Sequence, residues 1–300
     1  MAAFGIAHQI DSFHDKMMKP IEVILAPYHG GVRGVRVGGG PVRLMELGLT
    51  EDLERAGIEV SVSDLGQIPE CEGELGRAFE IKRRVACIVS EAIRAERFPL
   101  VLSGNCNAEV GTYAGLGSPD VPVVWFDGHT DFYTPDDIDQ GYFDSMGAAT
   151  LTGQCWKRLA NTVPGFVPLA PHRLIYCGSR HLEVRLLQRL SAAGVSMVEG
   201  GTRSSQSFAE RLGNLLPRTS EEALIHLDMD CVDTSVGMAN EYSEPGGLLR
   251  EDLLACLDQI VARCEPLALT VASYDPGQPG SDQIGELAIA AIKRVIGLHK

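Results

Sequence analysis

Six short runs of apolar, mostly β-branched residues recur along the chain, and each predicts a strand that is buried on both faces. The runs cover residues 21–25, 100–102, 121–126, 174–176, 223–227 and 267–271. Between them, apolar residues recur at helical spacing and predict helices at 41–56, 75–96, 146–160, 182–193, 208–216, 250–264 and 282–298. Because strands and helices alternate, we expect an α/β fold in which helices cover both faces of a mostly parallel sheet.

Residues 1–300 are expected to form a single domain, with residues 1–20 as an N-terminal extension. With 300 residues and 45% hydrophobic content, the chain can fill one large core or two small ones. No stretch of Pro, Gly or Ser long enough to act as a linker interrupts the alternation of strands and helices, and this favours one core.

The formal net charge of −14 argues against nucleic acid and anionic membranes as partners, because like charges repel. A surplus of carboxylates also suits a divalent cation, which needs oxygen ligands to offset its lost hydration. The eight cysteines show no two-residue spacing, which is typical of reduced thiols in a reducing compartment. No segment has the length of a signal-peptide core or of a membrane-spanning helix, so we expect a cytoplasmic protein.

Polar residues directly follow four of the predicted strands. In a parallel sheet, ligands bind beyond the carboxyl ends of the strands, where the loops of neighbouring strands converge. The four segments are Gly104 to Asn107, Asp127 to Asp131, Gly178 to His181 and Asp228 to Asp233. We expect these loops to face one cleft.

Asp127, His129 and Asp131 alternate at the exit of a predicted strand, so extended backbone would point all three side chains to one side. Buried without a partner, such groups would cost several kcal/mol, and a divalent metal would remove that cost. The alternative is a solvated turn whose polar side chains only cap the following segment.

The segment around Asp228 repeats this pattern, with His226, Asp228 and Asp230 on one face. Two such triplets predict a binuclear, oxygen-rich site, for which Mn²⁺ is the natural occupant. We interpret His226, one position earlier in its strand, as a core or supporting histidine rather than a ligand.

Three blocks of the sequence, in their order and spacing, resemble the ureohydrolase family of arginase and agmatinase. The blocks are Trp125 to Asp131, Leu227 to Asp233 and Glu244 to Leu248. Weaker matches at Ser103 to Asn107 and Cys177 to Arg180 extend the resemblance over residues 21–296. The resemblance implies an arginase-like, three-layer α-β-α fold, a small-molecule substrate and a homo-oligomer, either a trimer or a hexamer.

The resemblance also implies a mechanism and a set of ligands. A pair of Mn²⁺ ions in each chain shares a hydroxide, which attacks a guanidinium carbon and releases urea or a urea analogue. Asp127 and Asp228 would bridge both metals. Asp131 would complete one metal site, and His129 with Asp230 would complete the other.

Cys106 stands where the family has a histidine ligand. A thiolate can still bind a metal, although Zn²⁺ or Fe²⁺ suits it better than Mn²⁺. One branch with this exchange is that of the amidinohydrolases of D-cycloserine biosynthesis, which cleave Nω-hydroxy-L-arginine to hydroxyurea and ornithine. The run from His129 to Gly153 is similar to that branch as well.

Two further positions differ from the family. Asp144, or its neighbour Ser145, stands where the family has a proton-shuttling histidine, which makes Asp144 a catalytic candidate alongside His129 and Asp131. Ser273 stands where the family has a glutamate that binds the guanidinium, and a neutral hydroxyl does not replace such an ion pair. We therefore expect a substrate less basic than a free guanidinium, or one that is held by another carboxylate.

Glu183 and Tyr133 complete the candidates for substrate binding. Glu183 lies in the loop where the family holds a substrate amino group, although an exposed carboxylate at the start of a helix is an equal alternative. For Glu109 we expect a first-turn helix residue rather than a cleft residue.

Together these observations predict a metal-dependent amidinohydrolase of a small guanidino or N-hydroxyguanidino compound, with Nω-hydroxy-L-arginine as the preferred case. One alternative is hydrolysis of another amidine or amide at the same metal pair. A second alternative is a degenerate relative that keeps the fold and one metal and serves as a binding or partner subunit.

Overall fold

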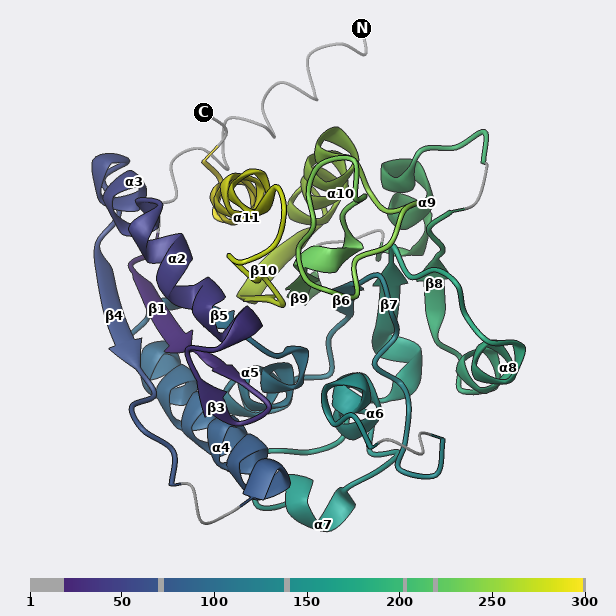
Figure 1. Ribbon diagram of the computed structural model, residues 1–300, viewed down its shortest axis with the longest axis horizontal. Helices are drawn as coiled ribbons and strands as arrows, with labels where there is room; N and C mark the ends of the chain where they lie inside the picture. Colours follow the sequence, from purple (N-terminus) through teal and green to yellow (C-terminus); the bar gives the residue numbers. More distant parts are fainter. Residues whose placement is uncertain (1–18, 70–72, 138–140, 202–203, 218–220, 299–300) are drawn as a thin grey trace, which may run out of the picture.

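An eight-stranded parallel sheet forms the middle of the molecule in the computed structural model, which describes residues 19–69, 73–137, 141–201, 204–217 and 221–298 (Figure 1). The strand order is β4-β1-β5-β10-β9-β6-β7-β8, and all neighbouring strands run parallel. The strands are β1 (Ile21–Ala26), β4 (Val60–Asp64), β5 (Phe98–Ser103), β6 (Val123–Phe126), β7 (Leu174–Cys177), β8 (Ser196–Val198), β9 (Glu221–Asp228) and β10 (Cys264–Ala272). A small antiparallel pair, β2 (Tyr28–His29) and β3 (Val32–Arg33), follows β1.

The last two strands of the sequence, β9 and β10, lie between β5 and β6. As a result, β5 and β6 are consecutive in the sequence but are separated by two strands in the sheet. Because all eight strands are parallel, the carboxyl ends of β5, β10, β9 and β6 meet at one edge of the sheet. Such a switch point is where open α/β sheets bind their ligands.

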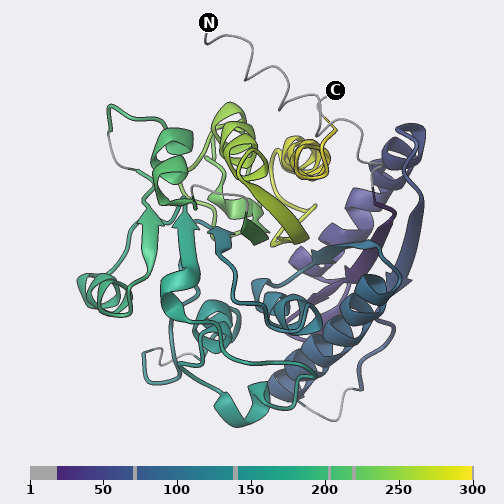
Figure 2. The ribbon, with the colours of Figure 1, turned by 180° about the vertical axis from the view of Figure 1, so that it is seen from behind.

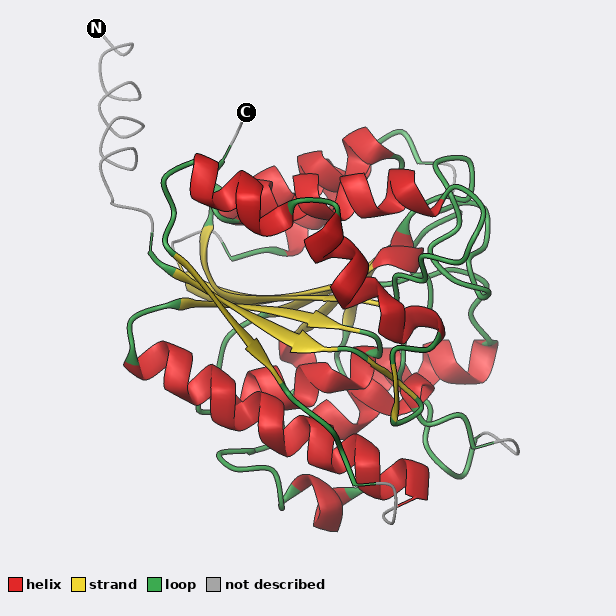
Figure 3. Cartoon of the chain, turned by 60° about the vertical axis from the view of Figure 1, so that its left-hand side comes forward, coloured by secondary structure: helices red, strands yellow, loops and turns green. Residues whose placement is uncertain are grey.

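Helices cover both faces of the sheet and complete three layers (Figure 3). One core cluster joins the sheet to α2 (Gly40–Glu46), α3 (Leu49–Arg55), α9 (Phe208–Leu215), α10 (Arg250–Val261) and α11 (Ser281–Val295). A second cluster joins the other face to α4 (Gly73–Arg94), α5 (Glu109–Gly115), α6 (Gly147–Leu151), α7 (Lys157–Ala160) and α8 (Val184–Ala192), and Figure 2 shows these layers from behind. The strands β1, β5, β6 and β7 are therefore buried at every position, and the predicted three-layer α/β fold is confirmed.

Several elements differ from the sequence prediction. The edge strands β4 and β8 are missed, because β4 is polar and only half-buried and β8 has three residues. The predicted helix 41–56 is divided into α2 and α3 at Gly48, where φ is 90°. The predicted helix 146–160 is divided into α6 and α7, with left-handed backbone at Gly153 and Trp156.

No helical run is predicted over residues 109–115, although Glu109 is expected in the first turn of a helix. Helix α5 occupies this segment and packs closely against α4. A Cβ at Gly111 would lie 2.5 Å from the backbone oxygen of Lys82, and a Cβ at Gly115 would lie 2.6 Å from that of Ala86. The two glycines therefore set the distance between these helices. This contact helps to position the loop that carries Cys106, because α5 follows directly on that loop.

The described chain bears on three further predictions. No described helix has the length and apolar character needed to cross a membrane. Six described cysteines carry free thiols, as expected from the cysteine spacing: Cys87, Cys106, Cys155, Cys177, Cys231 and Cys256. Residues 1–18 of the predicted N-terminal extension lie outside the described residues, and a single domain over residues 1–300 stays a prediction.

We expect Gly111→Ala to lower the free energy of unfolding by about 1–3 kcal/mol, because the added methyl group has to displace the backbone of α4. Urea and thermal unfolding followed by circular dichroism measure the change. Gly277→Ala is the matched control, since a Cβ there would meet only the side chain of Asp275, at 3.2 Å. Equal stability of Gly111→Ala and the native chain would contradict the close packing of α4 and α5.

Candidate metal centre

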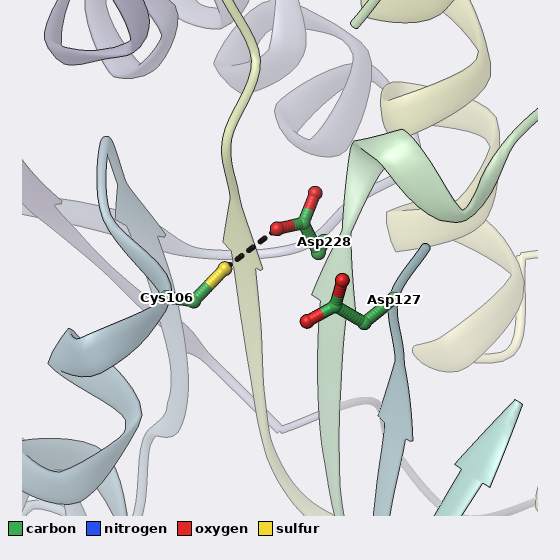
Figure 4. A group of neighbouring side chains, drawn as sticks. All are labelled: Cys106, Asp127 and Asp228. Carbon is green, nitrogen blue, oxygen red and sulfur yellow. Dashed lines mark hydrogen bonds between the residues drawn. The ribbon is translucent and has the colours of Figure 1, made fainter. Parts of the chain in front are cut away.

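Loops after four adjacent strands bring polar side chains together. Cys106 follows β5, Asp127 follows β6, Asp228 ends β9 and Ser273 follows β10. The thiol of Cys106 lies 2.7 Å from Asp228 Oδ2 and 3.1 Å from Ser273 Oγ. In Figure 4 the side chains of Cys106, Asp127 and Asp228 point toward one common space.

Two overlapping groups of side chains have the spacing of metal ligands. Within each group the ligand atoms lie within 4.8 Å of one another: Cys106, Asp127 and Asp228 form one, and Asp127, His129 and Asp230 form the other. All these residues are buried except His129. Because Asp127 belongs to both groups, these residues would be suited to hold a pair of divalent cations of the kind used in two-metal hydrolytic sites.

Hydrogen bonds from the loops fix these carboxylates. The indole N–H of Trp125 donates to Asp127 Oδ2 at 2.9 Å, and the backbone N–H of His129 donates to Asp127 Oδ1 at 2.6 Å. The backbone N–H of Gly128 donates to Asp230 Oδ1 at 2.9 Å. Glycine is required at this position, because a Cβ would lie 2.9 Å from the backbone oxygen of Asp230.

Without a cation, this cluster of acids is electrostatically costly. Burial and neighbouring carboxylates raise the pKa of Asp131 and of Asp228 well above the usual range. Burial and the charge of Asp228 also raise the pKa of the Cys106 thiol, which then donates to Asp228 as a neutral group. Burial would raise the pKa of Asp230 too, but the adjacent His129 imidazole lowers it. A divalent cation would offset the repulsion, and carboxylate, imidazole and thiol donors are suited to bind one.

Asp131, predicted as a ligand and as a catalytic residue, lies in the wall of a cavity beside the candidate ligands. It has left-handed backbone, with a φ of 46°, and its side chain is nearly buried. It belongs to neither group of three ligands. Strained backbone of this kind is found preferentially at functional sites. Its two predicted roles stay predictions.

Asp144, the predicted proton carrier, accepts hydrogen bonds from the loop that carries Cys106. Its Oδ2 accepts from Asn105 Nδ2 at 2.5 Å and from the backbone N–H of Cys106 at 3.3 Å. Its Oδ1 accepts from the backbone N–H and the Nδ2 of Asn107, at 3.0 and 2.8 Å. Both oxygens are therefore engaged in holding the Cys106 loop. Burial raises the pKa of Asp144 despite these bonds, and its role in proton transfer stays a prediction.

A cavity of about 140 Å³ opens over the candidate ligands. The predicted site residues that line it are Cys106, His129, Asp131, Tyr133, Asp144, Ser145, Asp228, Asp230 and Ser273. Glu183 precedes α8 and is exposed, and it is not one of the described residues that line the cavity. Its charge, after burial, contributes to raising the pKa of Tyr133, so it lies near the cavity rather than in its wall.

His226 and Glu109 form a fully buried pair behind the site, with 3.4 Å between Nδ1 of the imidazole and Oε2 of the carboxylate. The imidazole also packs on the Trp125 ring, at 3.9 Å between centroids, and thus supports the indole that binds Asp127. This agrees with the interpretation of His226 as a supporting histidine. Glu109 begins α5, as expected of a first-turn residue, but it is buried.

Two residues of the site are missed by the sequence analysis. Asn240 Nδ2 donates to Asp230 Oδ2 at 3.0 Å and to the backbone oxygen of Ser273 at 3.2 Å. Lys82 is fully buried, and its ammonium donates to Asn107 Oδ1 at 2.6 Å. Neither belongs to a motif. The only signal in the sequence is a lysine on the apolar stripe of the predicted helix 75–96.

Comparisons with known proteins agree with this geometry. A family profile described as "Arginase family" matches residues 19–297. An arginase of Eremothecium gossypii is 26% identical over 296 residues, which cover 91% of this chain and 73% of the relative. The Nω-hydroxy-L-arginine amidinohydrolase of Streptomyces lavendulae is 24% identical over 220 residues, covering 73% and 75%. The crystal structure of an arginase from Bacillus subtilis shares the fold, with a TM-score of 0.78, 23% identity and coverage of 93% of this chain and 99% of that one.

We expect the protein, purified without chelator and supplied with Mn²⁺, to hold about two ions per chain, and Asp228→Ala to hold fewer than about one. Asp228 lies in the group with Cys106 and Asp127, and its Oδ1 accepts from the backbone N–H of Asp230, a member of the other group, at 2.8 Å. Elemental analysis after dialysis gives the count. Cys106→Ser should lose about one ion, because the group around His129 is left intact.

Asp120→Ala is the control for this measurement, because Asp120 is exposed and pairs with Arg173 far from the cluster. It should bind as much metal as the native chain. A native chain that takes up no Mn²⁺, Fe²⁺ or Zn²⁺ would contradict the metal centre and support the alternative of a partner subunit.

The buried ammonium of Lys82 predicts a dependence of stability on pH. Burial lowers the pKa of Lys82 from 10.5 to about 7, although the charge of Asp144 acts in the opposite direction. Between pH 10.5 and 7 the unfolded state binds a proton at Lys82 that the folded state does not. The folded state therefore becomes less stable as the pH falls from about 10.5 to about 7. Relative to the native chain, Lys82→Met should become less stable as the pH rises through this range, by at most about 1.4 kcal/mol per pH unit.

Urea unfolding of both proteins at pH 7, 8, 9 and 10 tests this expectation. Lys293→Met is the control, since Lys293 is partly exposed and pairs with Asp52 at 3.1 Å. Its stability relative to the native chain should stay constant over the same range. A pH-independent difference between Lys82→Met and the native chain would show that Lys82 is not perturbed by burial.

Proposed function

Because the chain belongs to the arginase family, we propose that it is a metal-dependent amidinohydrolase, a hydrolase of C–N bonds in linear amidines. The substrate class is a small guanidino or N-hydroxyguanidino compound. The observation that carries the proposal is the pair of ligand groups that share Asp127, because the other four members of these groups all line one cavity. Relatives named as arginases and as an amidinohydrolase support it.

The residues that would hold the cations come from three loops. Cys106, Asp127, Asp131 and Asp228 would hold one, and Asp127, His129, Asp228 and Asp230 would hold the other. When bound, a pair of divalent ions supplies Lewis acidity and activates water at neutral pH. Mn²⁺ is the proposed metal because oxygen donors predominate, while the thiol of Cys106 would favour Zn²⁺ or Fe²⁺ in its own position.

Asp144, which lines the cavity, is suited to transfer protons. A carboxyl group transfers protons best when its pKa approaches the working pH. Burial raises the pKa of Asp144, and its side chain lines the cavity. Its hydrogen bonds to the Cys106 loop hold this carboxyl in place.

Ser273 narrows the choice of substrate. Its hydroxyl lies 3.1 Å from the Cys106 thiol, directly beside the candidate ligands. A neutral hydroxyl does not pair with a guanidinium cation as a carboxylate does, and an N-hydroxyguanidine is less basic than a guanidine. Together with the relative named for Nω-hydroxy-L-arginine, this supports that compound as the preferred substrate.

Cys106 and Ser273, which differ from the family, also support two alternative functions. A binding or partner subunit would tolerate both differences. A hydrolase of another amidine or amide would tolerate the serine at position 273. On the resemblance to the family, we propose a homotrimer or homohexamer that works in the cytoplasm.

We expect the Mn²⁺-loaded protein to release hydroxyurea from Nω-hydroxy-L-arginine with a kcat/KM about tenfold above that for release of urea from L-arginine, because the Ser273 wall offers no carboxylate to a full cation. Agmatine, acetamidine and glutamine complete the panel, with hydroxyurea, urea and ammonia measured separately. Asp228→Ala is the inactive control.

Ammonia from an amide or amidine, without urea or hydroxyurea, would replace the proposal with the broader hydrolase. A fully metal-loaded protein that turns over none of these compounds would refute hydrolysis and leave the binding subunit.

A further inference from the structure

An ion pair stands in the outer wall of the cavity. Arg36 and Glu241 form two parallel contacts, with 2.7 Å from Nη1 to Oε1 and 2.8 Å from Nη2 to Oε2. Both residues line the same cavity as Cys106 and Asp228. Neither belongs to the two ligand groups, and neither falls within a block of family resemblance. The pair is therefore unassigned by the proposed chemistry.

The pair lies at the mouth of the cavity and the candidate ligands lie at its floor. The side chains of Arg36 and Glu241 are 53% and 40% exposed, whereas Cys106 is 1% and Asp228 is 4% exposed. A ligand whose reactive end reaches the floor therefore has its other end beside this ion pair.

Both partners are held by buried neighbours. Glu241 is flanked by Asn240, whose Nδ2 is bound to Asp230 and whose Oδ1 accepts from the backbone N–H of Tyr242 at 2.8 Å. The Tyr242 ring packs on Tyr142, with 5.6 Å between centroids. The loop from Asn240 to Tyr242 thus joins the floor of the cavity to its mouth.

Arg36 has left-handed backbone, with a φ of 49°, at the start of a 3₁₀ turn (Arg36–Gly39). The next two residues, Val37 and Gly38, are buried, and Gly38 lies against the backbone of Tyr28, which a Cβ would meet at 3.0 Å. The turn therefore holds the position of the arginine, so a fixed cation and a fixed anion face the cavity together.

We propose that Arg36 and Glu241 bind the zwitterionic end of an α-amino-acid substrate, with Arg36 contacting the carboxylate and Glu241 the ammonium group. The assignment rests on the proposed function and adds the two residues that would recognise the α-amino and α-carboxylate groups of its substrate. A planar guanidinium presents paired donors that match a carboxylate. A zwitterion exchanges one ion pair for two, whereas a ligand without the carboxylate would bring an unmatched cation to Arg36.

The neutral side chain of Ser273 supports this assignment. Because Ser273 offers no charge to a substrate, an ion pair with the substrate has to come from a different residue of the cavity wall. Glu183, the sequence-based candidate for the α-amino group, is not among the described residues of the cavity wall, whereas Glu241 is.

Calorimetric titration of the Mn²⁺-loaded protein with three ligands tests the proposal without catalysis. L-Ornithine carries both charged groups, putrescine lacks the carboxylate, and 5-aminopentanoate lacks the α-amino group. We expect ornithine to bind about tenfold more tightly than either analogue, the gain of one charge-assisted contact. Arg36→Met should abolish the preference over putrescine, and Glu241→Gln the preference over 5-aminopentanoate.

Two further variants separate recognition from stability. Arg36→Lys keeps the charge without the planar fork and should retain part of the preference. Arg33→Met is the matched control, because Arg33 pairs with Asp64 at 2.9 Å and does not line the described cavity. It should retain both preferences in full.

Preferences that survive Arg36→Met and Glu241→Gln would overturn the proposal, as would the failure of all three ligands to bind at millimolar concentration. The proposed function fails separately. Preferences lost as expected, in a protein that hydrolyses no guanidino compound, would keep the recognition site and remove the hydrolase. Hydrolysis accompanied by unchanged preferences would remove the recognition site alone.

Discussion

The burial of several carboxylates around one thiol is the constraint on which the rest of the site depends. The side chains of Asp127, Asp228 and Asp230 are buried, and Asp127 lies close to both of the others. Charges brought together in this way destabilise a fold unless donors or cations surround them. The indole of Trp125 and the backbone N–H groups of Gly128 and His129 supply part of that compensation. A divalent cation supplies the remainder most directly, so the fold and the chemistry share one requirement.

Much of this arrangement could be predicted from the sequence because it is local. Continuous apolar runs indicated the buried strands, and acidic residues at their exits marked the candidate ligands. Asp127, His129, Asp228 and Asp230 are indeed brought together. The edge strand β4 escaped because a half-exposed strand lacks the apolar signal, and the break at Gly48 escaped because helical spacing continues across it.

The remaining contacts depend on the fold rather than on any local pattern. Asn240 meets Asp230 through a loop with no periodic signal, and Lys82 meets Asn107 only because α4 packs against the Cys106 loop. The family resemblance suggests that Asp144 replaces a histidine, but it gives no sign of the hydrogen bonds to residues 105–107, which come from a 3₁₀ turn 38 residues away. Likewise, the partners Arg36 and Glu241 are 205 residues apart in the chain.

The late insertion of β9 and β10 between β5 and β6 also orders the events of biosynthesis. During translation, the segments that carry Cys106 and Asp127 are synthesised well before residues 221–272. Until then, the facing edges of β5 and β6 have no strand to pair with. Non-local pairing of this kind is slow and leaves partly folded chains exposed to aggregation. Each ligand group includes either Asp228 at the end of β9 or Asp230 in the turn that follows it, so a complete group forms only after this part of the chain has been synthesised. The free energy of metal binding would therefore stabilise the completed fold and would not stabilise partly synthesised chains.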